Sequence, residues 1–332
     1  MLYGTSQVNG RGRVPPSSED RISVENLMEG CDIFAVYDGH SGTEVANLCK
    51  KMLYKHIQEA IHTAGIGILK NIDAMTDLLK RVFIQHNKYL ASVIHTLDDS
   101  GSTATVAIIT STHIFLAYLG DSPCFLMNPQ TGRIIHEMGK HEPSLAVETA
   151  RIHAAGGTVE IDEYGIPRVD GMLAVARAFG DFSLNWKGNA PPANADWTKM
   201  KVPAHPDVMV WERPTTGVLA IMSDGLVETD TSTLKPLAQI AHDIQIGLEG
   251  SAYNLKGAAD KVVAAHVRQG TTGRKYDGDD LSIILVDVST GIGISAGQQE
   301  GGKVAKPPTR KSKGRRKART EKQSRLIKIF SM

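Results

Sequence analysis

Residues 31–42 read CDIFAVYDGHSG, an apolar run that stops abruptly at an acid, a glycine and a histidine. The run Cys31–Tyr37 has the composition of a strand buried on both faces, and helical spacing begins a few residues later. A carboxylate at a strand exit can bridge cations, a glycine lets its carbonyl approach an ion closely, and a nearby histidine can transfer a proton. A lone Asp-Gly pair is usually an ordinary turn, so the interpretation depends on whether the pattern recurs.

The pattern recurs at the ends of other apolar runs. Like Asp38, further acids stand at predicted strand termini: Glu19-Asp20, Asp121, Asp224-Gly225 and Asp279-Asp280. Gathered carboxylates repel one another, so each needs a proton or a hard cation. Because a ligand set made of oxygens alone suits Mg²⁺ or Mn²⁺ better than zinc, we expect a site for one of these two metals.

The order of predicted elements favours an α+β fold. Apolar and β-branched runs predict strands at Cys31–Tyr37, Thr103–Thr110, His113–Leu119, Cys124–Asn128, Asp207–Trp211, Val218–Met222 and Leu281–Val288. Helical spacing predicts helices over Val45–Leu53, Met75–Tyr89, Leu234–Ile244 and Leu255–His266. The short links Thr110–His113 and Gly120–Pro123 predict hairpins, and the helices arrive in consecutive pairs. This order indicates packed layers rather than a doubly wound sheet.

Composition places the chain among globular proteins. Its 332 residues, 41% of them hydrophobic, are enough for a full core. No apolar stretch reaches the ~18 residues that a membrane span needs, and Met1–Arg13 lacks the apolar segment of a secretory signal. The three widely spaced cysteines, Cys31, Cys49 and Cys124, predict neither a zinc site nor a disulfide framework. We therefore expect an intracellular protein with inert core cysteines. We also expect the chain to be a monomer.

The charge is distributed unevenly along the chain. Twelve Lys and Arg face one acid between Lys303 and Lys328, which leaves 25 bases and 35 acids elsewhere. Residues 291–332 are too polar and charged to build a core, so we expect a folded domain over residues 1–290 followed by a disordered basic tail. Trp186–Val202, interrupted by prolines and without periodicity, predicts a surface loop.

Seven sequence blocks together resemble the 2C-type metal-dependent serine/threonine protein phosphatases. In the family's order they are FAVYDGHSG, SGSTAT, LGDS, ARIHAAGGTV, LAVARAFGD, MSDGL and DDLSIILV, spread over about Glu19 to Asp287. The resemblance implies a four-layer α-β-β-α sandwich with two central antiparallel sheets. It also implies hydrolysis of phosphoserine and phosphothreonine in protein substrates, by attack of a water that bridges two Mg²⁺ or Mn²⁺ ions.

The resemblance also implies roles for individual residues. Asp38 would bridge both cations, and Gly39 would bind one through its carbonyl. Asp224 and Asp279 would hold the other cation, and His40 would be the general acid that protonates the departing oxygen. Three more acids complete the predicted metal set: Glu19, Asp20 and Asp121. Of these, Glu19 would order metal-bound water, and Asp121 would help to bind a third, weaker cation.

The chain departs from the family at three places. The family's phosphate-binding arginine is displaced, because Val14 and Pro15 occupy its usual positions; Arg13 is the candidate to replace it, with Arg21 as the alternative. Pro123 stands where an arginine commonly follows the GDS block. Lys140-His141-Glu142-Pro143 inverts two charges of the family motif, which either preserves a local ion pair or alters a weaker metal site.

Other functions stay open at this point. A catalytically weak phosphatase-like module that binds phosphoproteins or regulates a partner is the second class, and a nucleic-acid-binding protein, supported by the tail alone, is the third. The basic tail is interpreted as a nuclear import signal, a contact for an anionic partner or a solubilising end. These readings predict a nuclear or cytoplasmic location. Arg177 is expected in a buried structural pair, and Ser102 and Thr103 in structural roles at a strand start.

Overall fold

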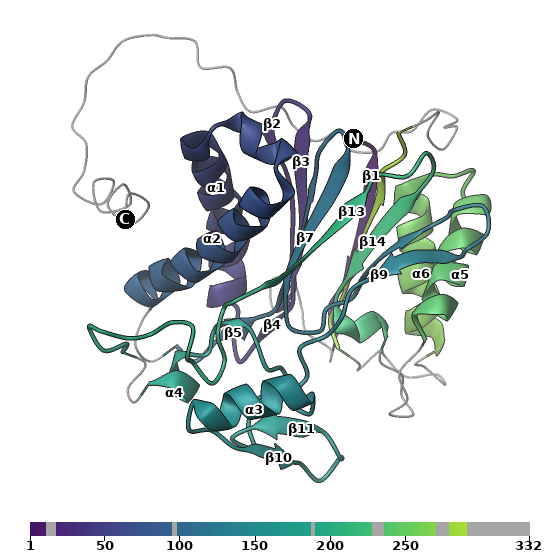
Figure 1. Cartoon of the computed structure of the whole chain (residues 1–332). Helices are drawn as coiled ribbons and strands as arrows, with labels where there is room; N and C mark the ends of the chain where they lie inside the picture. Colours follow the sequence, from purple (N-terminus) through teal and green to yellow (C-terminus); the bar gives the residue numbers. More distant parts are fainter. Residues whose placement is uncertain (11–17, 95–97, 187–189, 228–235, 270–278, 291–332) are drawn as a thin grey trace, which may run out of the picture.

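The computed structural model describes residues 1–10, 18–94, 98–186, 190–227, 236–269 and 279–290. Within them, two five-stranded sheets stack face to face, and a pair of long helices covers the outer face of each (Figure 1). All strand pairings among the described residues of these two sheets are antiparallel. The predicted α-β-β-α sandwich is therefore confirmed.

The first sheet has the strand order β13-β7-β6-β3-β2. Its strands are β2 Arg21–Met28, β3 Cys31–Tyr37, β6 Ala104–Ile109, β7 His113–Leu119 and β13 Asp207–Glu212. The helices on its outer face are α1 Glu44–Ala64 and α2 Ile72–Val93, joined by the 3₁₀ helix η1 Ile66–Lys70. At the start of α2 the Asn71 side chain accepts a hydrogen bond from the amide of Ala74, which caps the helix.

The second sheet has the strand order β1-β15-β14-β8-β9. Its strands are β1 Tyr3–Val8, β8 Cys124–Met127, β9 Ile134–Glu137, β14 Val218–Met222 and β15 Leu281–Asp287. Its helices are α5 Leu237–Glu249 and α6 Leu255–Gln269. The sequence analysis did not predict β1, which pairs with β15 along its whole length, from Tyr3 opposite Val286 to Val8 opposite Leu281.

Alternation along the strands explains the layers. In β3, Phe34 and Val36 pack between the two sheets, whereas Ile33, Ala35 and Tyr37 pack against the helices of the first layer. All five side chains are fully buried. A strand with apolar neighbours on both faces reads as a continuous hydrophobic run, which is why its bounds were predictable.

One predicted hairpin is wrong. The link Thr110–His113 does join two neighbouring strands, β6 and β7, but Gly120–Pro123 carries the chain from β7 in the first sheet to β8 in the second. A short link with a glycine at φ 86° looks the same in the sequence in both cases. Pairing is decided by distant strands, and the crossing places Asp121 where the two sheets meet.

Short elements extend the sandwich at one end. They are β4 Gly39–His40, β5 Gly101–Ser102, β12 Phe179–Gly180, β10 Val159–Ile161, β11 Pro167–Val169, α3 Ala146–Ala154, α4 Phe182–Asn185 and the 3₁₀ helix η3 Asp224–Leu226. Strands β4, β5 and β12 form one small sheet, and β10 and β11 form another. Residues 142–178, with α3, β10 and β11, are called the flap; they lie beneath the sheet ends in Figure 1.

The segment Trp186–Val202 is a loop, as predicted, in its described part, residues 186 and 190–202. It is nevertheless anchored, because Met200 and Val202 are buried and the Trp186 and Trp197 rings lie 4.8 Å apart, packed against the hydrophobic core between the first sheet and helices α1 and α2. No described helix is long and apolar enough to cross a membrane. The predicted tail, residues 291–332, lies outside the described residues.

Candidate active site

A cavity of about 520 Å³ opens between the sheet ends and the flap. It brings together seven of the predicted site residues, Glu19, Asp38, Gly39, His40, Asp121, Asp224 and Asp279. The remaining lining residues are Ser41, Thr103, Arg168, Leu173, Ala174, Val175. Residues that are up to 260 positions apart in the chain therefore share one site.

The two sheets contribute acids from opposite sides. Asp38 follows β3 in the first sheet, whereas Asp224 follows β14 and Asp279 precedes β15 in the second. The amide of Asp224 donates to Asp38 Oδ2 across 3.3 Å, which links the two strand ends directly. Thr103 holds Asp38 in place, since its amide donates to the Asp38 carbonyl at 2.9 Å and its Oγ1 accepts from the Asp38 amide at 3.2 Å.

Both Asp-Gly pairs need glycine for a steric reason. A Cβ on Gly39 would lie 2.6 Å from the carbonyl oxygen of Glu19, and a Cβ on Gly225 would collide with the carbonyl of Asp280. Backbone segments from distant parts of the chain therefore touch at the site without a side chain between them. This contact keeps the acids close together.

The carboxylates crowd one another strongly. Burial raises the pKa of Asp38 well above its usual value, and the charges of Asp224, Asp20, Asp279 and Asp121 raise it further. Buried carboxylates that repel one another in this way indicate a site that binds cations or protons.

The donor set fits a hard cation. Among the described residues no three His, Cys, Asp or Glu side chains are grouped closely enough to hold an ion unaided. Mg²⁺ usually takes only one or two carboxylates, and retains several waters. The oxygens of Asp38, Gly39, Asp224 and Asp279 suit that pattern.

Glu19 and Asp20 have different positions. Glu19 lines the cavity, and its Oε1 accepts the amide of Gly42 at 2.8 Å. Asp20 is 2% exposed and is not among the described lining residues. Burial raises its pKa to about 6, against the opposing effect of hydrogen bonds from Ser282 and Ser223. Asp20 therefore lies behind the cavity wall rather than in it.

Asp280 organises the backbone beside Glu19. Its two carboxylate oxygens accept the amides of Gly10 and Glu19, both at 2.7 Å. These residues flank the segment 11–17, and an aspartate can accept both amides where an asparagine has one acceptor oxygen. The candidate Arg13 lies in that segment, outside the described residues.

The alternative arginine, Arg21, does not reach the cavity. Its guanidinium donates to Asn47 Oδ1 at 2.6 Å and to the carbonyls of Ser18 and Asp20 at 2.5 and 2.7 Å. Arg21 therefore fixes the backbone that leads into β2.

His40 has a partner that the sequence analysis missed. Its Nε2 lies 2.8 Å from Asp181 Oδ1, and Asp181 is 4% exposed. Burial lowers the pKa of His40, but the charge and hydrogen bond of Asp181, with smaller contributions from Glu19 and Asp121, outweigh it and raise the net pKa. A cation bound nearby would oppose that rise. The sequence signal was the Gly180-Asp181 pair that ends LAVARAFGD.

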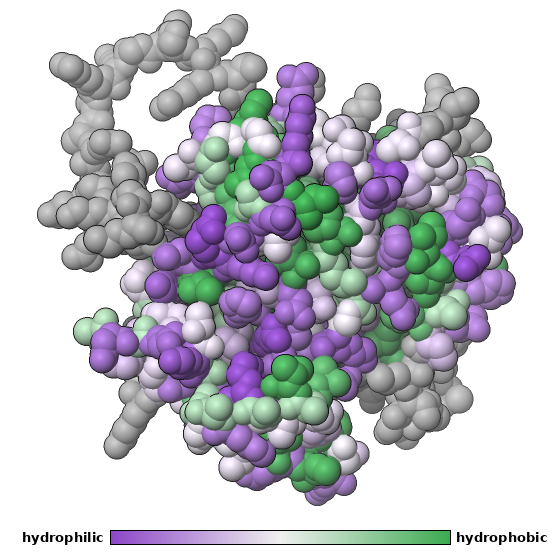
Figure 2. Space-filling model, viewed as in Figure 1, coloured by the Kyte–Doolittle hydropathy of each residue, from purple (hydrophilic) through white to green (hydrophobic). Residues whose placement is uncertain are grey.

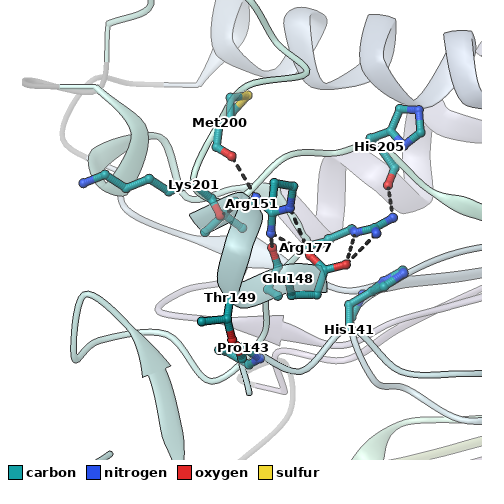
Figure 3. Close-up of polar contacts among 12 residues, drawn as sticks. His141, Pro143, Glu148, Thr149, Arg151, Arg177, Met200, Lys201 and His205 are labelled. Carbon is teal, nitrogen blue, oxygen red and sulfur yellow. Dashed lines mark hydrogen bonds and ion pairs between the residues drawn. The ribbon is translucent and has the colours of Figure 1, made fainter. Parts of the chain in front are cut away.

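The flap is held by a buried ion network around Glu148 on α3 (Figure 3). Arg151 and Arg177 both bond the carboxylate of Glu148, and Arg177 continues to the carbonyl of His205. Burial raises the pKa of Glu148, but the two arginines outweigh it and lower the net value. Arg177 and Glu148 thus form the buried structural pair that was predicted for Arg177 from the sequence. Lys140 and Glu142, the swapped charges, form an ion pair at 3.3 Å.

The remaining candidates have structural roles. Ser102 is fully buried and donates to the carbonyl of Thr103, whose own Oγ1 lies 2.7 Å from Ser122 Oγ. The three cysteines are free and buried, and burial raises the pKa of each thiol. These thiols are therefore poor nucleophiles, as expected.

Comparisons with known proteins agree with this geometry. The family model described as protein phosphatase 2C matches residues 16–273. Protein phosphatase 1B of Mus musculus is 26% identical over 305 residues, which cover 89% of this chain and 72% of the mouse protein. Protein phosphatase 1A of Homo sapiens is 32% identical over 218 residues, 64% of this chain and 54% of the human protein. A crystal structure of a Toxoplasma gondii phosphatase shares the fold, with a TM-score of 0.70 at 21% identity over 86% of this chain and 92% of that one.

Proposed function

This chain belongs to the protein phosphatase 2C family and is a metal-dependent serine/threonine protein phosphatase, and on that premise we propose how its own residues divide the work. The observation that carries the proposal is the gathering of five carboxylates around one cavity at the ends of two sheets. A cavity wall with five carboxylates repels a phosphate ester unless cations lie between the carboxylates and the ester.

The proposed metal ligands are the four positions at the strand ends. Asp38, the carbonyl of Gly39, Asp224 and Asp279 would hold two Mg²⁺ or Mn²⁺ ions, and Asp121 would help a third, weaker one. When bound, the ions polarise water for in-line attack on phosphorus and neutralise charge on the phosphoryl oxygens. Glu19 orients water in the cavity, and Arg13 is proposed to bind the phosphoryl group.

His40 is proposed to protonate the departing seryl or threonyl oxygen. Because the Asp181 carboxylate accepts the hydrogen on Nε2, the ring is held in one orientation, and in the protonated imidazolium Nδ1 carries the hydrogen that would be donated. The imidazole is therefore already oriented before proton transfer. General acid catalysis by a positioned group is worth roughly 10²–10⁴ in rate.

The experiment is direct. The purified chain should release phosphate from a phosphothreonine peptide with Mn²⁺, and lose that activity with chelator. Specific binding of the phosphopeptide without turnover would instead support a phosphoprotein-binding module that regulates a partner. The intact set of carboxylates favours turnover.

The basic tail, residues 291–332, supports a separate proposal about location. Its excess of Lys and Arg suits an import receptor or another anionic partner, so the chain would be nuclear as well as cytoplasmic. We propose that the catalytic domain works as a monomer, and size-exclusion chromatography with light scattering tests this.

A further inference from the structure

One residue on the flap stands out from the rest of the cavity wall. Among the lining residues that the structure describes, Arg168 is the single lysine or arginine, and it faces a set that includes five carboxylates. It lies on β11, on the flap side of the cavity, whereas the carboxylates come from the sheet ends. The cavity therefore has an acidic wall and a wall with one cation.

The flap hairpin holds Arg168 in place. Its Nε donates to Asp162 Oδ2 at 2.7 Å, and its Nη1 donates to the carbonyl of Met172 at 3.1 Å. Asp162 is itself fixed, since its Oδ1 accepts the amides of Tyr164 and Ile166, both at 2.9 Å. A guanidinium anchored by its own turn loses little freedom when it binds a ligand.

Part of the guanidinium remains available. Within the described residues, Nη2 and the second hydrogen of Nη1 have no hydrogen-bond partner, and the Arg168 side chain is 28% exposed. The neighbouring Val169 is fully buried in the flap core, so the strand's alternation turns Arg168 away from that core. Two adjacent N–H groups in one plane match the two oxygens of a carboxylate.

The surroundings favour recognition by charge. The surface between the flap and the sheets is largely hydrophilic, whereas hydrophobic patches lie on the flap itself (Figure 2). The phosphoryl group of a substrate belongs at the carboxylate wall, where the proposed cations lie. The opposite wall then meets the peptide on either side of the phosphorylated residue.

From this arrangement we infer that Arg168, positioned by Asp162, is a specificity residue that binds an acidic side chain flanking the phosphoserine or phosphothreonine. This inference rests on the proposed function and names the substrate class that the site prefers. The partner of Arg168 is a glutamate or aspartate of the substrate. The phosphoryl group that reacts is bound elsewhere.

A peptide series tests the inference. A neutral phosphothreonine peptide is compared with versions that carry one glutamate, or one lysine, at successive positions on either side of the phosphothreonine. The ratio of kcat/KM for the glutamate and lysine versions is used, so that any general change of turnover cancels. The wild-type chain should favour glutamate about tenfold at one or two positions. Arg168→Met should remove this preference, and Arg168→Glu should reverse it.

A second pair of variants separates charge from positioning. Asp162→Asn keeps the arginine but weakens its anchor, and should reduce the glutamate preference without reversing it. Lys201→Met is the matched control, because Lys201 forms a similar ion pair with Asp170 at 2.7 Å and 25% exposure but does not line the cavity. Its glutamate preference should equal that of the wild type.

Two results would overturn the inference. One is a wild-type chain with no glutamate preference at any position. The other is an Arg168→Met variant that loses the same factor on every peptide and on p-nitrophenyl phosphate, which would place Arg168 on the phosphoryl group. Calorimetry with the same peptides and Asp279→Asn measures the glutamate preference in binding, without turnover. This measurement distinguishes a failure of the phosphatase assay alone from a failure of this inference.

Discussion

The carboxylate of Asp181 lies 2.8 Å from Nε2 of His40, although the two residues are 141 positions apart in the chain. Three short strands bring them together: β4 carries His40, β5 lies in the middle, and β12 leads into Asp181. Asp181 adopts φ 49°, a left-handed conformation that directs its side chain back toward the ring. Asn87 on α2 holds the backbone just before Asp181, since its Oδ1 accepts a hydrogen bond from the Gly180 amide at 3.0 Å.

Asp181→Asn should reduce turnover of a phosphothreonine peptide by roughly 10²-fold, because a neutral amide replaces the carboxylate charge that favours the protonated ring. Asparagine tolerates the left-handed backbone, so the fold should persist. p-Nitrophenyl phosphate, whose leaving group needs no proton, should lose much less. Equal losses on both substrates would contradict a role in proton donation.

Gly101→Ala should mimic that defect. A Cβ on Gly101 would collide with both His40 Nε2 and the Asp181 carboxylate, so a single methyl group would force the pair apart. Gly67→Ala, at a position with nothing within 4 Å of the added carbon, is the matched control. The two variants are compared by kcat on the peptide and by thermal unfolding. An active Gly101→Ala enzyme would show that the pair is dispensable.

Asp224→Asn and Asp279→Asn should each abolish turnover while the fold stays intact, because each change removes the charge of a proposed metal ligand with little change of volume. In metal-free buffer the variants should unfold at the same or a higher temperature than the wild type, since repulsion around Asp38 is relieved. Mn²⁺ should stabilise the wild type more than either variant. Near-normal activity at modest Mn²⁺ would reject the assignment of these ligands.

His56 on α1 and His86 on α2 predict an acid sensitivity of the fold. Their Nδ1 atoms lie 2.9 Å apart in the core. Burial lowers the pKa of His56 to about 4, with help from Lys55, and burial and His56 lower that of His86 well below its usual value. Both rings are neutral in the folded chain, whereas the unfolded chain takes up their protons below about pH 6.5. Stability from this pair is therefore complete above pH 6.5 and is lost as the pH falls.

The measurement is urea unfolding of the wild type and His86→Gln at pH 7.5 and 5.5. One buried neutral histidine loses about 1.4 kcal/mol at pH 5.5, so the wild type should lose that much more than the variant between the two pH values. Contributions from the carboxylates cancel in this difference. Parallel losses would show that His86 takes up a proton in the folded state.

Removal of residues 291–332 should leave peptide dephosphorylation almost unchanged and shift the protein from nucleus to cytoplasm. The expectation comes from composition, because twelve bases against one acid between Lys303 and Lys328 act through long-range charge, and no family motif extends beyond Asp287. Fluorescent fusions of the full and shortened chains give the location. A salt-sensitive rise in activity on truncation would favour autoinhibition, and an unchanged location would reject the import signal.

The sequence predicted the bounds of most central strands, but it did not predict how all of the strands pair and connect. The bounds of β3, β7 and β14 were predicted without error, because each is an apolar run that a charged, glycine or serine residue closes. The strand β1 was missed because its residues are mostly polar or small, and its pairing with β15 depends on a partner more than 270 positions away. For the same reason the crossing at Gly120–Pro123 looked like a hairpin.

The site was predicted through its acids and not through their partners. Asp38, Asp224 and Asp279 each end or open a strand, a signal that local sequence carries. The bond between Asp181 and His40, the Asp280 bonds to two amides and the place of Arg168 on the cavity wall arise from tertiary packing alone. Asp20 shows the converse: it shares a motif with Glu19, but alternation along the backbone turns it behind the wall.

The cavity straddles the boundary between the two sheets, and this has a mechanical consequence. Apolar side chains hold the sheets face to face, and the hydrophobic effect itself has little directionality. If Asp38 on one sheet and Asp224 or Asp279 on the other share a cation, as proposed, that cation would connect the two sheets at one end of the stack. We therefore expect removal of metal to loosen the contact between the two sheets at this end of the stack.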